Sequence, residues 1–355
     1  MRLAFVGDPS SVHLKRWIGE FVARGHECTL FAPEGTPGAL VPYTAIGRAG
    51  ARGPVGFAHR VLDLRRQLRL LRPDVVNAHY AHNFGTWAAL AGHHPLVVTC
   101  WGSDLLGMEG RSPIERWKTR IALSSADLVT LNSEELRRAA LDLGAAPSRI
   151  EKVVIGIDPE PLLGAGDEKQ GAPAIVLSTR RLEPLYNIDD ILAACAEVLR
   201  TGRSLRLIVA SSGSLAGSLR DMADHLGMAE AVEFTGFVED AELVRLYRRA
   251  SVYVTVPSSD STAVSLLQAM AAGCAVVATD LPATREWVDT SAGNRLVGIG
   301  ARGEIASAIA ELLDAPDVCF PAGSFNSRLV VERADWTAEM DSMEALYERV
   351  AGAER

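Results

Sequence analysis

Residues 251–279 read SVYVTVPSSDSTAVSLLQAMAAGCAVVAT, and this stretch decides the fold. An apolar, β-branched run at 252–256 is interrupted by Pro257 and a loop of small polar residues. An apolar helical run at 263–272 and a second strand-like run at 274–278 follow, with one glycine between them. Strands that are apolar throughout are typical of a parallel sheet covered on both faces. The stretch therefore predicts a β-loop-α-β unit.

The loop at 258–262 brings the carboxylate of Asp260 and several hydroxyls to the start of that helix. The first N–H groups of a helix lack partners and its dipole is positive there, so this corner suits an anionic or polyhydroxylated ligand. Within the helix only Ser265 and Gln268 are polar, and their spacing puts them on one face. An unpaired buried amide is costly, so we expect Gln268 to contact a ligand. Hydrogen bonding of both groups within the protein is the alternative.

Length and composition limit the classes of protein. The 355 residues are enough for two domains, each with its own core. The formal net charge of −8, without a basic stripe, argues against nucleic acid as a partner. The five cysteines are scattered, which favours reduced core cysteines. We find no secretory signal and no apolar run of the ~20 residues that span a bilayer, so we expect a cytoplasmic location.

Apolar runs and helical patterns alternate along the chain, with a Gly/Pro-rich break at 156–173. Strands are expected at 2–6, 27–32, 74–78, 96–100, 127–131, 150–155, 174–178, 205–210, 231–234, 251–256, 274–278 and 295–297. Helices are expected at 11–24, 57–71, 83–92, 112–124, 133–143, 188–201, 214–226, 239–249, 263–272 and 303–313. Such alternation predicts, in each half, a parallel sheet with helices on both faces.

We therefore expect an α/β protein with an N-terminal domain at 1–160 and a C-terminal domain at 174–324. A terminal helical segment at 325–355 is expected to pack back towards the N-terminal domain, and its apolar side comprises Trp336, Met340, Met343 and Tyr347. Ligands of open α/β sheets bind at the carboxyl ends of the strands, so the site is expected in a cleft between the two halves.

On these features the chain resembles, over essentially its full length, the glycosyltransferases of family 4. Their architecture is called GT-B and consists of two facing, doubly wound Rossmann-like domains. In that family the C-terminal domain binds a nucleotide-sugar donor, and a Glu-x7-Glu motif lies in the β-loop-α unit quoted above. Asp260 and Gln268 stand at the matching positions, although neither is Glu. The resemblance implies that Asp260 contacts hydroxyls of the donor sugar and that Gln268 contacts the ribose.

A second match follows the predicted strand at 174–178, where residues 178–187 read STRRLEPLYN. The family has Gly-Arg-Leu there and a Lys five residues after the Arg, and the two cations neutralise the diphosphate. Arg181 aligns with the Arg, and Tyr186 stands in place of the Lys. We expect Arg180 to replace the missing cation, since a guanidinium donates two parallel hydrogen bonds to phosphate oxygens. Surface charge without a ligand is the alternative for both arginines.

The other donor residues follow from the order of the family's segments. The resemblance places Ser212 in the loop after the strand at 205–210, and Phe237 and Val238 beside the nucleotide base. It also implies that backbone N–H groups at the start of the helix stabilise the leaving diphosphate. These groups belong to Ser261, Thr262, Ala263 and Val264.

In the N-terminal half, Gly7 and His13 lie where the first predicted strand meets a helix, a place that suits the phosphate or sugar of the donor. A solvated helix face is the alternative for His13. Trp101 stands where many family members have a His that contacts the donor sugar, and we assign it to the acceptor side.

His79 and His82 follow a predicted buried strand and are also assigned to the acceptor. They lack a clear third ligand at zinc-site spacing, so we expect no metal. Asp104 is the nearest carboxylate and is our candidate for orienting or deprotonating the acceptor, with helix capping as the alternative.

The segment RVLDLRRQLRLLR at 60–72 predicts a basic amphipathic helix. Packing of its apolar face against the domain is the simpler interpretation, and contact with a membrane surface is the alternative. The acceptor class therefore stays open between a small molecule, a glycan and a lipid-linked molecule.

The resemblance implies a retaining transferase that moves a hexose-type sugar from a nucleoside-diphosphate sugar, with UDP favoured, to a hydroxyl acceptor. We expect no metal requirement and front-face attack, since no carboxylate is placed as a nucleophile. A nucleotide-sugar 2-epimerase is one alternative and would epimerise the donor without an acceptor. An inactive nucleotide-sugar-binding homologue is another and would bind nucleotide without transfer.

Overall fold

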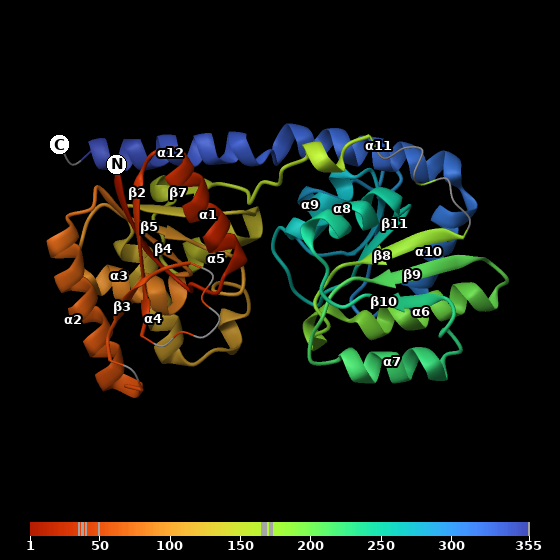
Figure 1. Cartoon of the computed structure of the whole chain (residues 1–355), viewed down its shortest axis with the longest axis horizontal. Coiled ribbons are helices and arrows are strands. Elements are labelled where there is room, and N and C mark those ends of the chain that lie inside the picture. The colour runs from red at the N-terminus through yellow and green to blue at the C-terminus, as the bar shows by residue number, and fades with distance from the viewer. Residues whose placement is uncertain are drawn as a thin grey trace. The chain divides into compact units, whose positions relative to one another are not determined.

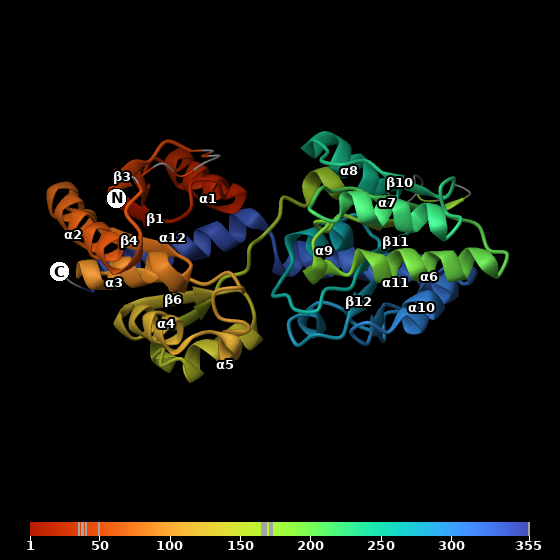
Figure 2. The ribbon, with the colours of Figure 1, turned by 90° about the horizontal axis from the view of Figure 1, so that it is seen from below.

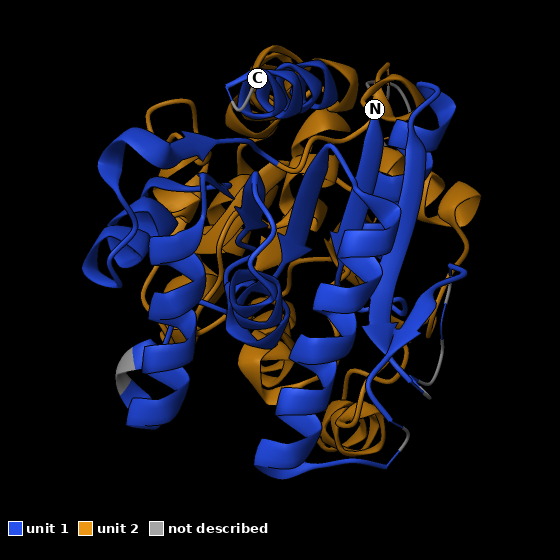
Figure 3. Ribbon diagram, turned by 90° about the vertical axis from the view of Figure 1, so that its left-hand side faces the viewer, with its two compact units in different colours: residues 1–154, 339–355 blue, residues 155–338 orange. Residues whose placement is uncertain are grey.

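The computed structural model describes the whole chain except residues 35, 37, 38, 40, 49, 165–168, 170–172, 354 and 355. Much of the Gly/Pro-rich break at 156–173 and the last two residues of the predicted terminal segment thus lie outside the described residues. The chain forms two compact units (Figure 3), residues 1–154 with 339–355 and residues 155–338. Within the described part, no helix has both the length and the apolar character needed to cross a bilayer.

Unit 1 is built on a parallel seven-stranded sheet in the order β3-β2-β1-β4-β5-β6-β7 (Figure 1). The strands are β1 (Arg2–Val6), β2 (Glu27–Pro33), β3 (Thr44–Ile46), β4 (Val75–His79), β5 (Leu96–Thr99), β6 (Leu128–Leu131) and β7 (Ile150–Lys152). The helices are α1 (Val12–Ala23), α2 (Gly53–Leu71), α3 (Thr86–Ala91), α4 (Pro113–Ser125), α5 (Glu134–Asp142) and most of α12 (Trp336–Gly352). Short helical turns are η1 (Ala81–Gly85), η2 (Met108–Gly110) and η3 (Pro147–Arg149).

Unit 2 contains a parallel six-stranded sheet in the order β10-β9-β8-β11-β12-β13. The strands are β8 (Ala174–Ser178), β9 (Leu205–Val209), β10 (Val232–Phe234), β11 (Val252–Thr255), β12 (Ala275–Thr279) and β13 (Arg295–Val297). The helices are α6 (Ile188–Arg200), α7 (Ala216–His225), α8 (Asp240–Arg249), α9 (Val264–Ala271), α10 (Arg302–Asp314) and α11 (Pro316–Arg333). Short turns are η4 (Glu160–Leu162), η6 (Pro184–Tyr186) and η7 (Thr284–Glu286). Figures 1 and 2 show α6 and α7 on one face of the sheet and α8, α9 and α11 on the other.

The predicted α/β class and the parallel sheets are confirmed, and the predicted strands all form with small shifts at their ends. Three local features differ. Helix α11 begins at Pro316, before the helical segment predicted at 325–355. The short edge strand β3 was not predicted. The helix predicted at 83–92 begins only at Thr86, because Tyr80 and Asn83 adopt positive φ angles of 76° and 58° and the chain turns through η1 first.

The predicted terminal segment at 325–355 is divided between the units, since α11 belongs to unit 2 and residues 339–355 belong to unit 1. The predicted apolar side is confirmed: all four of its side chains are buried. Tyr347 ties α12 to the core of unit 1, because its hydroxyl accepts a hydrogen bond from Nε1 of Trp17 (3.2 Å) and donates one to Oδ1 of Asn77 (2.6 Å). The last helix is therefore an integral part of the first unit.

In each sheet the strand order reverses once, between β1 and β4 in unit 1 and between β8 and β11 in unit 2. In open parallel sheets, ligands bind beyond the carboxyl ends of the two strands that flank this reversal. In unit 2 these ends lead into Arg180 and into the loop that contains Asp260. The residues singled out by sequence thus stand at the place where this topology forms sites.

Candidate functional site

The loops that follow β8, β9 and β11 interlock at the carboxyl edge of the sheet in unit 2. Nδ2 of Asn187 donates a hydrogen bond to the carbonyl oxygen of Val256 (2.8 Å). The N–H of Leu182 donates to the carbonyl oxygen of Ser212 (3.1 Å). A Cβ on Gly213 would lie only 2.4 Å from the Leu182 oxygen, so a glycine is required there. These contacts fix the loops against each other.

Arg180 is the centre of this edge. Its Nη2 lies 2.7 Å from Oδ2 of Asp260, and its Nη1 donates to Oγ of Ser265 (3.1 Å). The ring of Tyr186 covers the guanidinium, with 4.4 Å from Cζ to the ring centroid, which is a cation–π contact. Only 10% of the Arg180 side chain is exposed. The structure therefore joins the loop after β8 to the loop and helix after β11 through one cation.

Asp260 is the partner of that cation, and 20% of its side chain is exposed. Burial raises the pKa of its carboxyl above the usual range, while the positive charge of Arg180 acts in the opposite direction. Oδ1 accepts a hydrogen bond from the backbone N–H of Ser261 (2.9 Å). The Ser261 N–H, predicted to face a diphosphate, is therefore engaged with the neighbouring carboxylate.

The next predicted donor groups lie at the start of α9. Oγ1 of Thr262 accepts a hydrogen bond from Nε1 of Trp287 (3.3 Å), which holds this residue in the core. Ala263 precedes the helix and offers no side-chain cap to the first turn, which begins at Val264. The positive end of the α9 dipole is thus left without a capping side chain.

A hydroxyl network beneath the site was not predicted. Oγ1 of Thr179 lies 2.8 Å from Oη of Tyr247 and 3.1 Å from Oη of Tyr253. The Tyr247 hydroxyl also donates to Oε1 of Gln268 (3.3 Å). Half of the Gln268 amide is therefore satisfied within the protein, as the alternative in the sequence analysis had it. The available signal was a tyrosine in the apolar strand β11 and another on the apolar side of the charged helix α8.

Other predicted donor residues are spread around this edge. Arg181 is not paired with Asp260: 72% of its side chain is exposed, and its Nη2 lies 3.9 Å from Oε1 of Glu183. Ser212 is exposed in the loop after β9. Phe237 is 78% exposed, and Val238 beside it is half-buried. No contact joins these four residues to Arg180 or Asp260 among the interactions of the described residues.

In unit 1, the predicted residues near the carboxyl ends of β1, β4 and β5 form an aromatic cluster. Trp101 stacks on His13 and on His79, each with 5.5 Å between ring centroids. Trp17 meets the edge of the His79 ring at 5.3 Å. A Cβ on Gly7 would come within 2.6 Å of a Leu14 methyl group, so this glycine makes room for α1. The predicted acceptor residues His79 and Trp101 are thus brought together.

Asp104 lies at the loop after β5 and is fully buried. Its carboxylate accepts hydrogen bonds from the backbone N–H groups of Ala81 (2.9 Å), Trp101 and Gly102 (both 3.0 Å). This geometry binds the backbone of two loops and is not the helix capping given as the alternative; it joins the loop after β5 to the turn after β4. His82 lies in that turn, with Nε2 at 3.9 Å from Oε1 of Glu115.

We predict that the ring of His79 stays neutral down to acidic pH. The side chain is 1% exposed, neither ring nitrogen has a hydrogen-bond partner, and burial lowers its pKa to about 3. In the unfolded chain the pKa is about 6.5, so below that pH only the unfolded state binds this proton. The free energy of unfolding therefore decreases as the pH falls from about 6.5 towards 3, by up to ~1.4 kcal/mol per pH unit from this group.

NMR of the imidazole nitrogens between pH 8 and pH 5 checks this prediction. A ring that titrates with a midpoint near 6.5 would contradict it. The variant His79→Leu should show a flatter dependence of the melting temperature on pH below 6.5 than the unchanged protein.

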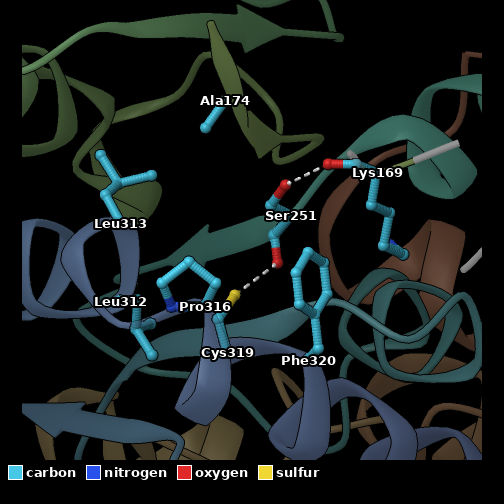
Figure 4. A pocket seen from close by; sticks show the side chains of 8 residues that line it. All are labelled: Lys169, Ala174, Ser251, Leu312, Leu313, Pro316, Cys319 and Phe320. Carbon is cyan, nitrogen blue, oxygen red and sulfur yellow. Dashed lines mark hydrogen bonds between the residues drawn. The ribbon is translucent and has the colours of Figure 1, made fainter. Parts of the chain in front are cut away.

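Unit 2 also contains a pocket of about 430 Å³ that is separate from the site around Arg180 (Figure 4). Ala174 begins β8 and Ser251 precedes β11, so the pocket is at the amino ends of the strands, away from Arg180. Nζ of Lys169 donates to the carbonyl oxygens of Tyr247 and Ala250.

Among the described residues, no group of three or more His, Cys, Asp or Glu side chains is placed to hold a metal ion.

Comparison with known proteins gives two family matches that together span most of the chain. Residues 165–320 match the family described as glycosyl transferases group 1, and residues 10–161 match glycosyltransferase family 4. A D-inositol 3-phosphate glycosyltransferase of Nocardia farcinica is 32% identical over 351 residues, which cover 86% of this chain and 77% of that protein. The alignments with two other proteins of that name cover only 53% and 57% of their length, so the chain spans little more than half of them.

Solved structures share the fold at low sequence identity. The sucrose-phosphate synthase of Thermosynechococcus elongatus superposes with a TM-score of 0.83 at 16% identity, over 99% of this chain and 100% of that chain. The Anabaena protein HepE in complex with UDP superposes with a TM-score of 0.83 at 16% identity, over 98% of this chain and 100% of that chain. The two-domain α/β fold of the GT-B class is thereby confirmed.

Proposed function

Because the chain belongs to the group 1 and family 4 glycosyltransferases, we propose that it transfers a hexose-type sugar from a nucleoside-diphosphate sugar to an acceptor hydroxyl. The observation that carries the proposal is the cluster of Arg180, Asp260 and Ser265 at the strand-order reversal of unit 2. The guanidinium of Arg180 can donate two parallel hydrogen bonds to phosphate oxygens, and the carboxylate of Asp260 and the hydroxyl of Ser265 can bind sugar hydroxyls.

The nucleotide is proposed to be UDP. HepE, which shares the fold, is described in complexes with UDP and with UDP-glucose. In this chain the exposed ring of Phe237 follows Gly236 in the loop after β10 and offers a face for a base. Ser212 and Val238 are proposed to border the nucleotide, and Gln268 to contact the ribose through the part of its amide that Tyr247 leaves available.

The proposed chemistry retains the configuration at the anomeric carbon. The bond between C1 of the sugar and the phosphate oxygen breaks as the acceptor oxygen bonds to C1 from the same face. The departing phosphate oxygen takes the acceptor's proton. Negative charge grows on the diphosphate as the bond stretches, and Arg180 with the N-terminus of α9 stabilises it. These fixed positive groups are the reason for proposing transfer without a divalent ion.

The acceptor is proposed to be a hydroxyl compound that contacts unit 1 near Trp101 and His82, with its class still open. On α2, Leu62 and Leu70 are exposed beside Arg66 and Arg69. This face is proposed as a weak contact for anionic lipid, which would suit a lipid-linked acceptor. Sedimentation with anionic vesicles and with neutral vesicles tests this contact. If the protein binds anionic vesicles no more than neutral ones, the contact is refuted.

The proposed transfer is tested by screening nucleoside diphosphates and their sugars for an increase in melting temperature, followed by transfer assays with and without EDTA. We expect UDP to stabilise the protein and transfer to survive EDTA. NMR of the first-formed linkage should show the donor's anomeric configuration. Binding without any transfer would favour an inactive homologue, and donor epimerisation without acceptor would favour a 2-epimerase.

A further inference from the structure

The guanidinium that is proposed to hold the diphosphate already has an anionic partner in the free protein. Nη2 of Arg180 is 2.7 Å from Oδ2 of Asp260, while Nη1 donates to Oγ of Ser265. The ring of Tyr186 covers one face of the guanidinium. Little of either charged side chain is exposed, so solvent screens this ion pair only weakly.

A diphosphate and Asp260 compete for the same donors. Carboxylate and phosphate oxygens both accept charge-assisted hydrogen bonds from a guanidinium. A phosphate bound next to a carboxylate that keeps its place would put two negative groups in one partly desolvated corner, which raises the free energy of the complex. The diphosphate therefore gains most from Arg180 when Asp260 leaves it.

We propose that donor binding is an exchange in which the diphosphate replaces Asp260 at Arg180 and the released carboxylate turns to the sugar. This inference rests on the proposed function and adds that the free site is occupied by an internal competitor. Asp260 lies in the loop between β11 and α9, outside both elements, so its side chain can change rotamer without disturbing them. Tyr186 and Ser265 hold the guanidinium in place during the exchange.

The exchange makes recognition of the sugar depend on the diphosphate. While Asp260 is paired with Arg180 and with the Ser261 N–H, each of its oxygens is engaged. When a free monosaccharide enters the site, Asp260 is still paired with Arg180 and cannot bind the sugar hydroxyls. When an intact donor binds, its diphosphate releases Asp260 from Arg180, and the carboxylate can then bind the sugar. We therefore infer that the site selects sugars that carry a diphosphate and excludes free sugars.

Calorimetric titration of the full chain with UDP tests the exchange. The variant Asp260→Asn removes the competing charge at nearly constant shape, and we expect its Kd for UDP to be about tenfold lower than that of the unchanged protein. Glu233→Gln is the matched control, because it also removes a carboxylate that pairs with an arginine, here Arg206 at 2.7 Å, and neither residue belongs to the proposed site. The control should change Kd by less than about twofold.

The outcomes separate this inference from the proposed function. If the unchanged protein binds UDP and Asp260→Asn binds it no more tightly, the exchange is refuted and the proposed function stands. If only Asp260→Asn binds UDP, the diphosphate does not displace Asp260 in the unchanged protein, and the exchange is refuted. If neither binds any nucleoside diphosphate, both proposals fail. Should Asp260→Asn not fold, a crystal structure of the unchanged protein with UDP decides, and an intact contact between Arg180 and Asp260 refutes the exchange.

Discussion

Replacing Arg180 by Gln is expected to lower kcat/KM for sugar transfer by about 100-fold or more. Arg180 is the cation that the structure places against both Asp260 and Ser265, where the charge of the leaving diphosphate is proposed to develop. Removal of one well-placed donor to a developing negative charge typically costs 10²–10³-fold in rate. Arg180→Lys keeps the charge but loses the fork, so it should recover only part of this activity. Steady-state kinetics with a fixed acceptor measure the effect.

Two further arginines make the experiment specific. Arg206 lies on β9, and its exposed side chain pairs with Glu233 at 2.7 Å, so Arg206→Gln should leave transfer unchanged. Arg181→Gln removes the exposed neighbour, and its rate relative to Arg180→Gln reports which guanidinium meets the diphosphate. Activity within a few-fold of the unchanged protein for Arg180→Gln would contradict the assignment, provided that its melting temperature is preserved.

The variant Gly323→Ala is expected to destabilise unit 2 by about 3 kcal/mol. Gly323 lies in α11, where an added Cβ would be only 2.0 Å from the carbonyl oxygen of Gly273. That oxygen is backbone, so the helix would have to move. Movement would strain the neighbouring hydrogen bond from Nδ2 of Asn326 to the carbonyl oxygen of Cys274 (2.8 Å). Calorimetry should show the transition of this unit roughly 8 °C lower.

Gly303→Ala is the control for the same chemical change. Gly303 lies in the first turn of α10, and its Cβ would meet nothing within 4 Å. Alanine restricts the unfolded chain more than glycine does, so this variant should be unchanged or more stable by up to ~1 kcal/mol. Equal melting temperatures for the two variants would show that α11 moves aside at little cost.

The strands were the most predictable part of this protein. Runs such as 252–256 and 274–278 are apolar at every position, because both faces of a parallel sheet are covered, and such runs are visible without any tertiary information. The edge strand at 44–46 has only three residues and pairs with a single strand, β2. Its apolar pattern is therefore too short to detect in the sequence. The turn at Ala81–Gly85 was missed because positive φ angles at Tyr80 and Asn83 leave no trace in side-chain periodicity.

Within the site, sequence could not distinguish Arg180 from Arg181. Both arginines lie in the loop after β8, which ends at Ser178, so no strand or helix periodicity tells which of the two side chains faces Asp260. The structure directs Arg180 to Asp260 and leaves Arg181 exposed. The role of Tyr186 was equally hidden, because its contact with the guanidinium depends on how the loop folds back after η6.

By itself the sequence determined the alternation of strands and helices, the parallel sheets and the corner of unit 2 where Asp260 meets a helix N-terminus. These features depend on local patterns of apolar, polar and turn-forming residues. Only the tertiary structure decided that Arg180 is paired with Asp260, that Asp104 binds backbone, and that Tyr347 meets Trp17 across 330 positions of the chain. Such contacts depend on side-chain direction and on long-range packing, which no local pattern encodes.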